Sequence, residues 1–146
     1  MGAIDDLITR LRRVDMSEII GNAIKTNEAE ILRLNTEVQL FKQGIGCDNV
    51  KLRPEYAALT KRLKKKSGQP INRVTLRDTG EFHENFIIEY SQDSITIKAE
   101  PTIREGVDLS QHLAERYGEN IYGLTEKHIE RTQKIIKPAI IAQILK

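Results

Sequence analysis

The chain has 146 residues, of which 39% are hydrophobic and 30% charged, with a formal net charge of +2. This length predicts one domain with a real core, and the composition argues against wholesale disorder. The small charge does not require a polyanionic partner, no apolar run approaches the roughly 20 residues of a membrane-spanning helix, and the single cysteine, Cys47, excludes an internal disulfide and a cysteine-based metal site.

Residues 1 to about 42 predict a helical N-terminal arm. Apolar residues between Ile4 and Val14 follow a 3.6-residue period, which indicates one short amphipathic helix. Asp15 and Glu18 form a capping-box pattern that predicts the start of a second helix. Along this second helix, apolar residues and one asparagine alternate in steps of four and three, as in a coiled-coil seam. The seam consists of Ile20, Ile24, Asn27, Ile31, Leu34, Val38 and Phe41.

Two interpretations of this seam stay open. The helix can lie on the core of its own domain, or it can pair with a neighbouring copy, where Asn27 would fix the register. The seam is too short for the pattern alone to discriminate between them. On the second interpretation the candidate interface residues are Ile20, Ile24, Ile31 and Leu34.

The central part, about residues 50–100, predicts a helix followed by a β-hairpin. Gly44 ends the second helix. Pro54 fits the first turn of the next helix, which we expect to run to about Lys66 before Ser67 and Gly68 close it.

A basic run, residues 61–66, ends this predicted helix. Its cations can complement the helix dipole and stay solvated, or they can contact phosphate, which needs charge but no particular spacing. No aromatic residue is interleaved with the cations, so a base-stacking surface is not expected. The candidate phosphate contacts are Lys61, Arg62, Lys64, Lys65 and Lys66.

Residues 76–90 combine a short capped turn with a strand. Asp78 and Glu81 have the spacing of a capping box, and Phe82 and Phe86 are four apart, so both rings should point to one side. The segments "FIIEY", "QDS" (residues 92–94) and "ITIKA" then predict strand, tight turn and strand. We expect the two phenylalanines to be buried and to anchor the hairpin, because an isolated two-stranded hairpin is only marginally stable in water.

The segment "EPTIREG" predicts a loop, and residues 108–146 predict C-terminal helices. Asp108 should cap a helix that ends before Gly118, and the last helix should begin after Thr125. Pro138 should kink or split this last helix. The apolar end beyond Pro138 is wider than a surface helix requires, which gives further candidate interface residues. These are Ile140, Ile141, Ile144 and Leu145.

The predicted class is therefore α+β, with long N-terminal helices, a central hairpin or small antiparallel sheet, and C-terminal helices. No pattern predicts catalysis, a cofactor or a metal site: the three histidines, His83, His112 and His128, lie in no ligand motif, and no glycine-rich phosphate loop occurs. A group of acids could suggest a metal-dependent nuclease, but two of them have the predicted capping role and one should face solvent. These acids are Asp78, Glu81, Glu84 and Glu89.

The segment "LRDTGEFHENF", followed by a hairpin and by "ERYGENIYGLT" with a final helix, resembles small virion proteins of tailed bacteriophages. These proteins are of the head-to-tail joining or tail-completion type and are found in phages and prophages of the Bacteroides group. Thr79, Gly80, Phe82 and Phe86 match the turn of that family, while Asn85 stands where serine is commoner. The segments "LNTEVQLFKQGIG" and "PEYA" followed by lysines are also similar, so the resemblance covers about residues 31–125.

This resemblance implies a structural, non-enzymatic subunit of the phage neck or of a tail-completion ring. Its implied partners are other copies of itself and neighbouring neck or tail proteins, with at most non-specific DNA contact and neither membrane nor small-molecule substrate. Its implied location is the virion, after synthesis in the bacterial cytoplasm, and the hairpin would present an edge to the next subunit. The alternative is a nucleic-acid-binding protein that uses residues 61–66.

Overall fold

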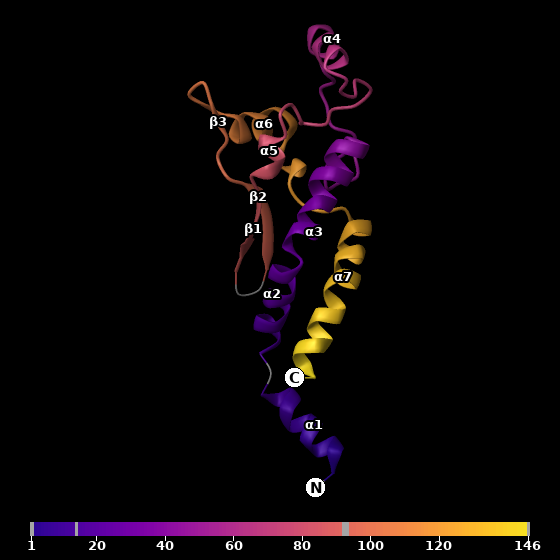
Figure 1. The fold of residues 1–146 in the computed structure, drawn as a ribbon, viewed down its shortest axis with the longest axis vertical. Helices are drawn as coiled ribbons and strands as arrows, with labels where there is room; N and C mark the ends of the chain where they lie inside the picture. Colours follow the sequence, from indigo (N-terminus) through magenta and orange to yellow (C-terminus); the bar gives the residue numbers. More distant parts are fainter. Residues whose placement is uncertain (1, 14, 92–93, 146) are drawn as a thin grey trace.

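The computed structural model describes residues 2–13, 15–91 and 94–145, and its fold is α+β. The molecule is elongated, with α1 at one end of the long axis and α4 at the other (Figure 1). The helices are α1 (Ala3–Arg12), α2 (Met16–Thr26), α3 (Glu28–Arg33), the π-helix η1 (Leu34–Gln43), α4 (Ala58–Lys66), α5 (Glu81–Glu84), α6 (Leu109–Tyr117), the 3₁₀ turn η2 (Glu119–Ile121) and α7 (Glu126–Ile144). The strands are β1 (Phe86–Tyr90), β2 (Ile95–Ala99), β3 (Ile103–Arg104) and β4 (Val107–Asp108).

The predicted N-terminal helices form, but the second is divided into α2, α3 and η1. Asp15 caps α2 by accepting from the amide of Glu18 at 3.3 Å, as expected. The side chain of Asn27 donates to the backbone oxygen of Ala23 at 2.9 Å, and α2 ends there. Val14, the last residue of the predicted first helix, lies outside the described residues.

Two residues of the predicted coiled-coil seam pack into the core of their own chain. Ile24 is 6% exposed and Ile31 is fully buried, and both belong to the main hydrophobic cluster. This burial corrects the expectation that they contact a neighbouring copy, because side chains covered by their own domain offer no surface to another. The first of the two interpretations of the seam therefore holds for these residues.

The predicted hairpin is confirmed, and the phenylalanines anchor it. β1 and β2 pair antiparallel, from Phe86 opposite Ala99 to Tyr90 opposite Ile95. Phe82 and Phe86 are each 3% exposed, and their ring centroids lie 5.1 Å apart in an edge-to-face arrangement. Gln92 and Asp93 of the predicted turn lie outside the described residues. The hairpin thus joins the helices through the aromatic pair.

Two predictions for this region are wrong: Asp78 does not cap the short turn, and the segment after the hairpin is not a loop throughout. Gly80, with φ +94°, occupies the N-cap position of α5, whereas Asp78 forms an ion pair with Arg104 at 3.1 Å. Arg104 also lies 3.7 Å from the carboxylate of Glu81. Arg104 belongs to the hairpin β3–β4, whose turn contains Glu105 at φ +53° and Gly106 at φ +79°. The acids hold a second hairpin in place instead of capping a helix.

Helix α4 begins at Ala58, four residues later than Pro54 predicted. The preceding segment is not helical, and it carries Tyr56 toward the core. There the Tyr56 hydroxyl accepts from the amides of Thr75 and Leu76, both at 3.1 Å. These two bonds fix the position at which α4 leaves the body of the protein.

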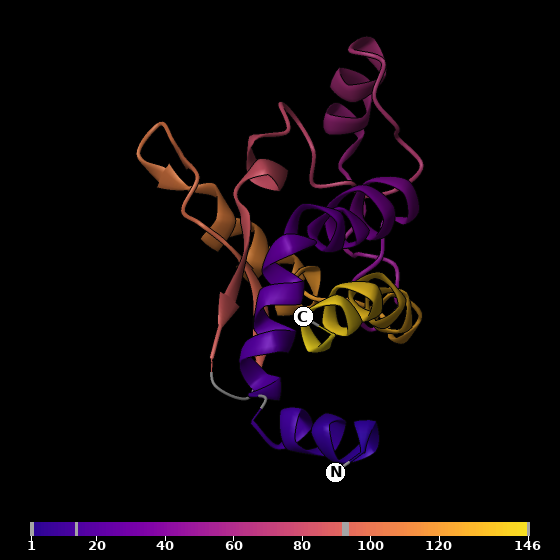
Figure 2. The ribbon, with the colours of Figure 1, turned by 60° about the horizontal axis from the view of Figure 1, so that its bottom comes forward.

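The predicted cap of α6 is confirmed, and α7 begins after Thr125, as predicted. Asp108 accepts from the amide of Ser110 at 3.1 Å, and Thr125 accepts from the amide of His128 at 3.3 Å. Pro138 does not split α7, which is continuous and packs alongside α2 (Figures 1 and 2). The candidate interface residues Ile140, Ile141 and Ile144 therefore belong to the same continuous helix.

A buried carboxamide pair, Asn35 and Gln39 on η1, ties the segment before α7 to the core. Asn35 donates to the backbone oxygen of Ile121 at 3.0 Å and accepts from the amide of Gly123 at 2.8 Å. Gln39 donates to the oxygen of Gly123 at 2.9 Å and accepts from the amide of Thr125 at 2.9 Å. Both side chains are fully buried. The pair therefore satisfies the backbone that leads into α7 and sets where that helix starts.

Candidate functional site

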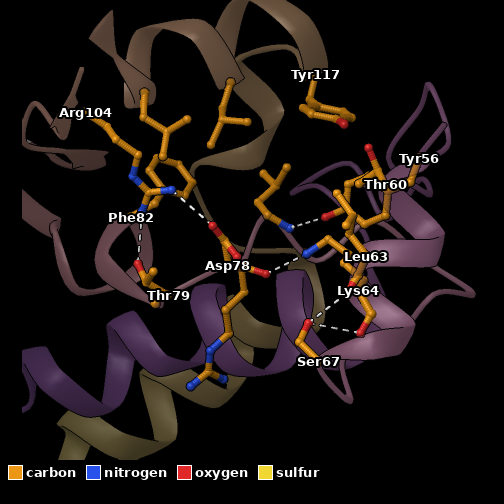
Figure 3. Close-up of a pocket in the computed structure, with 15 residues that line it drawn as sticks. Tyr56, Thr60, Leu63, Lys64, Ser67, Asp78, Thr79, Phe82, Arg104 and Tyr117 are labelled. Atoms are coloured by element: carbon orange, nitrogen blue, oxygen red, sulfur yellow. Dashed lines mark hydrogen bonds and ion pairs between the residues drawn. The ribbon is translucent and has the colours of Figure 1, made fainter. Parts of the chain in front are cut away.

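An open groove of about 360 Å³ lies between α4 and α6 (Figure 3). Its floor is formed by Leu76 and Phe82, both buried members of the hydrophobic core. One wall is the face of α4 and its preceding residues, and the other is the face of α6. The apolar side chains of the walls are Tyr56, Leu63, Leu109, Leu113 and Tyr117. The groove is thus an apolar channel flanked by two helices.

The charged side chains at the groove are bonded within the chain. Lys64 donates to the backbone oxygen of Arg77 at 2.8 Å and to Oε1 of Gln69 at 2.9 Å. Arg104 pairs with Asp78 as described and donates to Oγ1 of Thr79 at 3.1 Å (Figure 3). These groups position the walls, so we expect an occupant to be recognised mainly through apolar contact.

A second unpartnered apolar surface lies on α1. Its side chains Ile4, Leu7, Ile8 and Leu11 form a stripe on one face, as the 3.6-residue period predicts. Ile4 is 74% exposed, and Ile8, the least exposed of the four, is 41% exposed. No residue of α1 is buried, and the helix projects from the body (Figures 1 and 2). An apolar stripe of this kind is stabilised in water when another surface covers it.

The residues of the basic run do not form one outward cluster. Lys61 lies 3.6 Å from the carboxylate of Glu55, and Lys64 is held by the two bonds described above. Lys64 also lies over the ring of Tyr56, 4.9 Å from its centroid. Two of the five candidate phosphate contacts, Lys61 and Lys64, are therefore engaged within the chain. The remaining cations, Arg62, Lys65 and Lys66, are exposed and form no ion pair with any other described residue.

The other candidate interface residues divide between exposed and half-buried positions. Ile20, Ile141 and Leu145 are exposed. Leu34, Ile140 and Ile144 are half-buried. The start of α2 and the end of α7 lie at the same end of the molecule as α1 (Figure 1). The exposed apolar residues of the two termini therefore gather at one end, and the groove lies toward the other.

The acids that could suggest a nuclease are engaged or dispersed. Asp78 and Glu81 pair with Arg104, and Glu89 pairs with Lys98 at 2.8 Å. Within residues 2–13, 15–91 and 94–145, no group of three His, Cys, Asp or Glu side chains could hold a metal ion. Among the same residues, no helix is long and apolar enough to cross a membrane.

His83 is a buried titratable residue beside α5. Its Nε2 lies 3.0 Å from the backbone oxygen of Thr75 and so carries the proton, while Nδ1 has no partner among the described residues. Burial is the main cause that lowers the pKa of His83 to about 4, from 6.5. Protonation would place a second N–H in a site without an acceptor, so the neutral ring belongs to the folded state.

We expect stability to fall on acidification because of His83. Unfolded His83 takes up a proton near its ordinary pKa of 6.5, so between pH 6.5 and 4 the unfolded chain binds more protons than the folded one. Stability should drop by about 2 kcal/mol between about pH 7.5 and 5, measured by urea denaturation. His83→Gln should flatten this slope, whereas His112→Gln on an exposed site should not. Burial also lowers the pKa of His128, so a residual slope of the same sign should remain.

No family model, curated protein or solved structure matches the chain. The functional interpretation therefore rests on the geometry of the groove and of α1, and on the resemblance of the turn around Thr79 and Gly80. Sequence patterns could not reveal the groove, because its walls and floor come from three separated segments. The amphipathic period of α1 was visible in the sequence, but not that its stripe would stay uncovered.

Proposed function

We propose that this chain is a non-enzymatic structural subunit of a tailed bacteriophage, acting in the neck or in a tail-completion ring as one of several identical copies. The observation that carries the proposal is the exposed apolar stripe of α1, which no element of the described part of the chain buries. A protomer with such a helix is completed by a neighbour. The resemblance of the turn at Thr79 and Gly80, with its hairpin, supplies the class of protein.

The two small hairpins support the same proposal. β1–β2 and β3–β4 are separate two-stranded sheets, and no third strand among the described residues pairs with either. Their outer edges therefore keep unpaired backbone groups, which another chain can use. A protein that works alone usually covers or closes such edges, whereas a subunit of an assembly can leave them for a neighbour.

The location can be tested on phage particles. Particles should be purified from a host that carries the gene, labelled with an antibody against this chain and examined by electron microscopy. We expect label at the junction of head and tail, or at the end of the tail that joins it. Purified particles that lack the chain by both labelling and mass spectrometry would overturn the proposal.

Arg62, Lys65 and Lys66 favour a second, weaker candidate, which is non-specific DNA binding. Replacing all three with glutamine should weaken binding equally for all sequences and reduce the salt dependence by up to about three phosphate contacts, each worth roughly 0.9 in log–log slope. The measurement is fluorescence anisotropy with duplexes of different sequence at several salt concentrations.

A matched control removes the same charge from α7. Lys127, Arg131 and Lys134 are exposed, and replacing them with glutamine should change the slope less, because they lie outside the basic run. A footprint on one defined operator sequence would contradict non-specific binding and would favour a sequence-specific regulator.

A further inference from the structure

We infer that α1 of one copy binds in the groove between α4 and α6 of the next copy, so that the copies join head to tail. This inference rests on the proposed function, because it names the contact that would link identical subunits. In this contact the groove is filled by a helix, and the apolar stripe of α1 is buried. Four properties of the molecule carry the inference: reach, size, charge and symmetry.

The groove of the same chain is out of reach for α1. Helix α2 is packed against α7, and only three residues of sequence separate Arg12 from Met16. α2, α3 and η1 lie between α1 and α4, which are at opposite ends of the long axis (Figure 1). A 10-residue helix and three linking residues can span at most about 25 Å. An α1 helix in this groove would therefore come from another copy.

The dimensions of α1 and the groove agree. α1 has 10 residues and is therefore about 15 Å long, and α4, which forms one wall, has 9 residues and is about 14 Å long. A third helix laid between α4 and α6 would bring its apolar stripe onto Leu76 and Phe82 at the floor. The stripe residues are spaced i, i+3, i+4 and i+7, which is the pattern of a helix bound in a groove.

The charges favour one orientation. Asp5 and Asp6 lie in the first turn of α1, and Arg10 and Arg12 lie in its last turn. On α4, Lys64, Lys65 and Lys66 form the last turn, and Lys65 and Lys66 are exposed there. An antiparallel arrangement places the acids of α1 against these exposed lysines.

The antiparallel arrangement also pairs opposite charges at the C-terminal end of α1. It brings Arg12 toward Glu55, an exposed acid just before α4, and it opposes the two helix dipoles. A parallel arrangement would place arginines against lysines, so charge selects the antiparallel one.

The symmetry of this contact fits a ring. α1 and the groove are different surfaces, so the contact is heterologous and generates a closed ring or an open filament. Because α1 and α4 lie at opposite ends of the long axis, each copy would present its groove to one neighbour and its helix to the other (Figure 1).

The test uses two variants of the full chain that each lose one half of the contact. Leu7→Glu with Ile8→Glu places charges on the stripe of α1 and leaves the groove intact. Leu63→Glu places a charge on the wall of the groove and leaves α1 intact; this side chain is 59% exposed, so the fold should tolerate it. Circular dichroism and thermal melts should show that both variants are folded.

Light scattering after size exclusion then gives the result. The wild type should self-associate with increasing concentration, and each variant alone should stay monomeric. A mixture of the two should form a 1:1 dimer and nothing larger, because one intact helix then meets one intact groove. Leu59→Glu is the matched control: Leu59 lies on the same helix and is 63% exposed, but it does not line the groove, so this variant should associate like the wild type.

Several outcomes would overturn the inference. One such outcome is a wild type that stays monomeric even at about 1 mM, because the dissociation constant of the contact would then lie above that concentration. The two variants could fail to combine, or Leu59→Glu could be as damaging as Leu63→Glu. Binding of α1 to anionic vesicles without self-association would assign its stripe to lipid instead. Absence of the chain from particles would reject the proposed function and leave a positive association result standing.

Discussion

Replacing Phe82 with alanine is expected to lower the free energy of unfolding by about 3–5 kcal/mol. Phe82 is 3% exposed, and its ring packs 5.1 Å from that of Phe86 and 6.3 Å from that of Tyr122, measured between centroids. The ring joins α5, the hairpin and the segment before α7, and it forms part of the floor of the groove. Its removal would leave a cavity between α5, the hairpin and the segment before α7, and these elements are too constrained to collapse into it. Urea denaturation followed by circular dichroism measures the loss.

A surface variant gives the reference for this experiment. Ile103→Ala removes an apolar side chain that is 62% exposed on β3, so its effect should stay within about 0.5 kcal/mol. A denaturation midpoint for Phe82→Ala that equals that of the wild type would show that the aromatic pair does not anchor the hairpin.

Replacing Gln39 with methionine is expected to cost about 3 kcal/mol. Methionine has a similar length but cannot accept from the amide of Thr125 at 2.9 Å or from Nδ1 of His128 at 2.7 Å, and it cannot donate to Gly123. The amide of Thr125, the carbonyl oxygen of Gly123 and the imidazole of His128 would then be buried without a hydrogen-bond partner. An unsatisfied buried polar group costs more free energy than the loss of a hydrogen bond that water can replace. Hydrogen exchange should show the start of α7 as the segment that loses protection first.

Gln43→Met is the matched control for this variant. Gln43 lies on the same π-helix but is exposed, so the same chemical change removes no buried partner. The free energies of unfolding of the two variants should therefore differ by most of the roughly 3 kcal/mol expected for Gln39→Met. Equal stabilities would mean that water replaces the carboxamide at the segment before α7, and that the carboxamide pair does not position this helix.

The parts of the fold that depend on neighbouring residues in sequence were predictable. Asp15 and Asp108 cap the helices they were expected to cap, since a cap acts over two or three residues, and the last helix begins after Thr125 as predicted. The spacing of Phe82 and Phe86 likewise placed both rings on one side of a turn. The α+β class followed from these local signals and from the change of period at the hairpin.

The errors arose where a distant residue competed for a local role. Asp78 had the spacing of a cap, but Arg104, far along the sequence, binds it instead. Pro54 fitted the start of a helix, but the bonds of Tyr56 to the backbone of Thr75 and Leu76 keep that segment extended. A coiled-coil seam records only that one face is apolar, so it could not show that Ile24 and Ile31 face their own core.

The turn between β3 and β4 offers a place to mark the protein. Glu105 and Gly106 form its tip, both with positive φ, and the hairpin projects from the body away from α1 and from the end of α7 (Figures 1 and 2). Exposed tips of this kind tolerate inserted peptides, because few contacts depend on them. A short epitope placed there would report the position of each copy in an intact particle, whereas a tag fused to either terminus would crowd the end that carries α1.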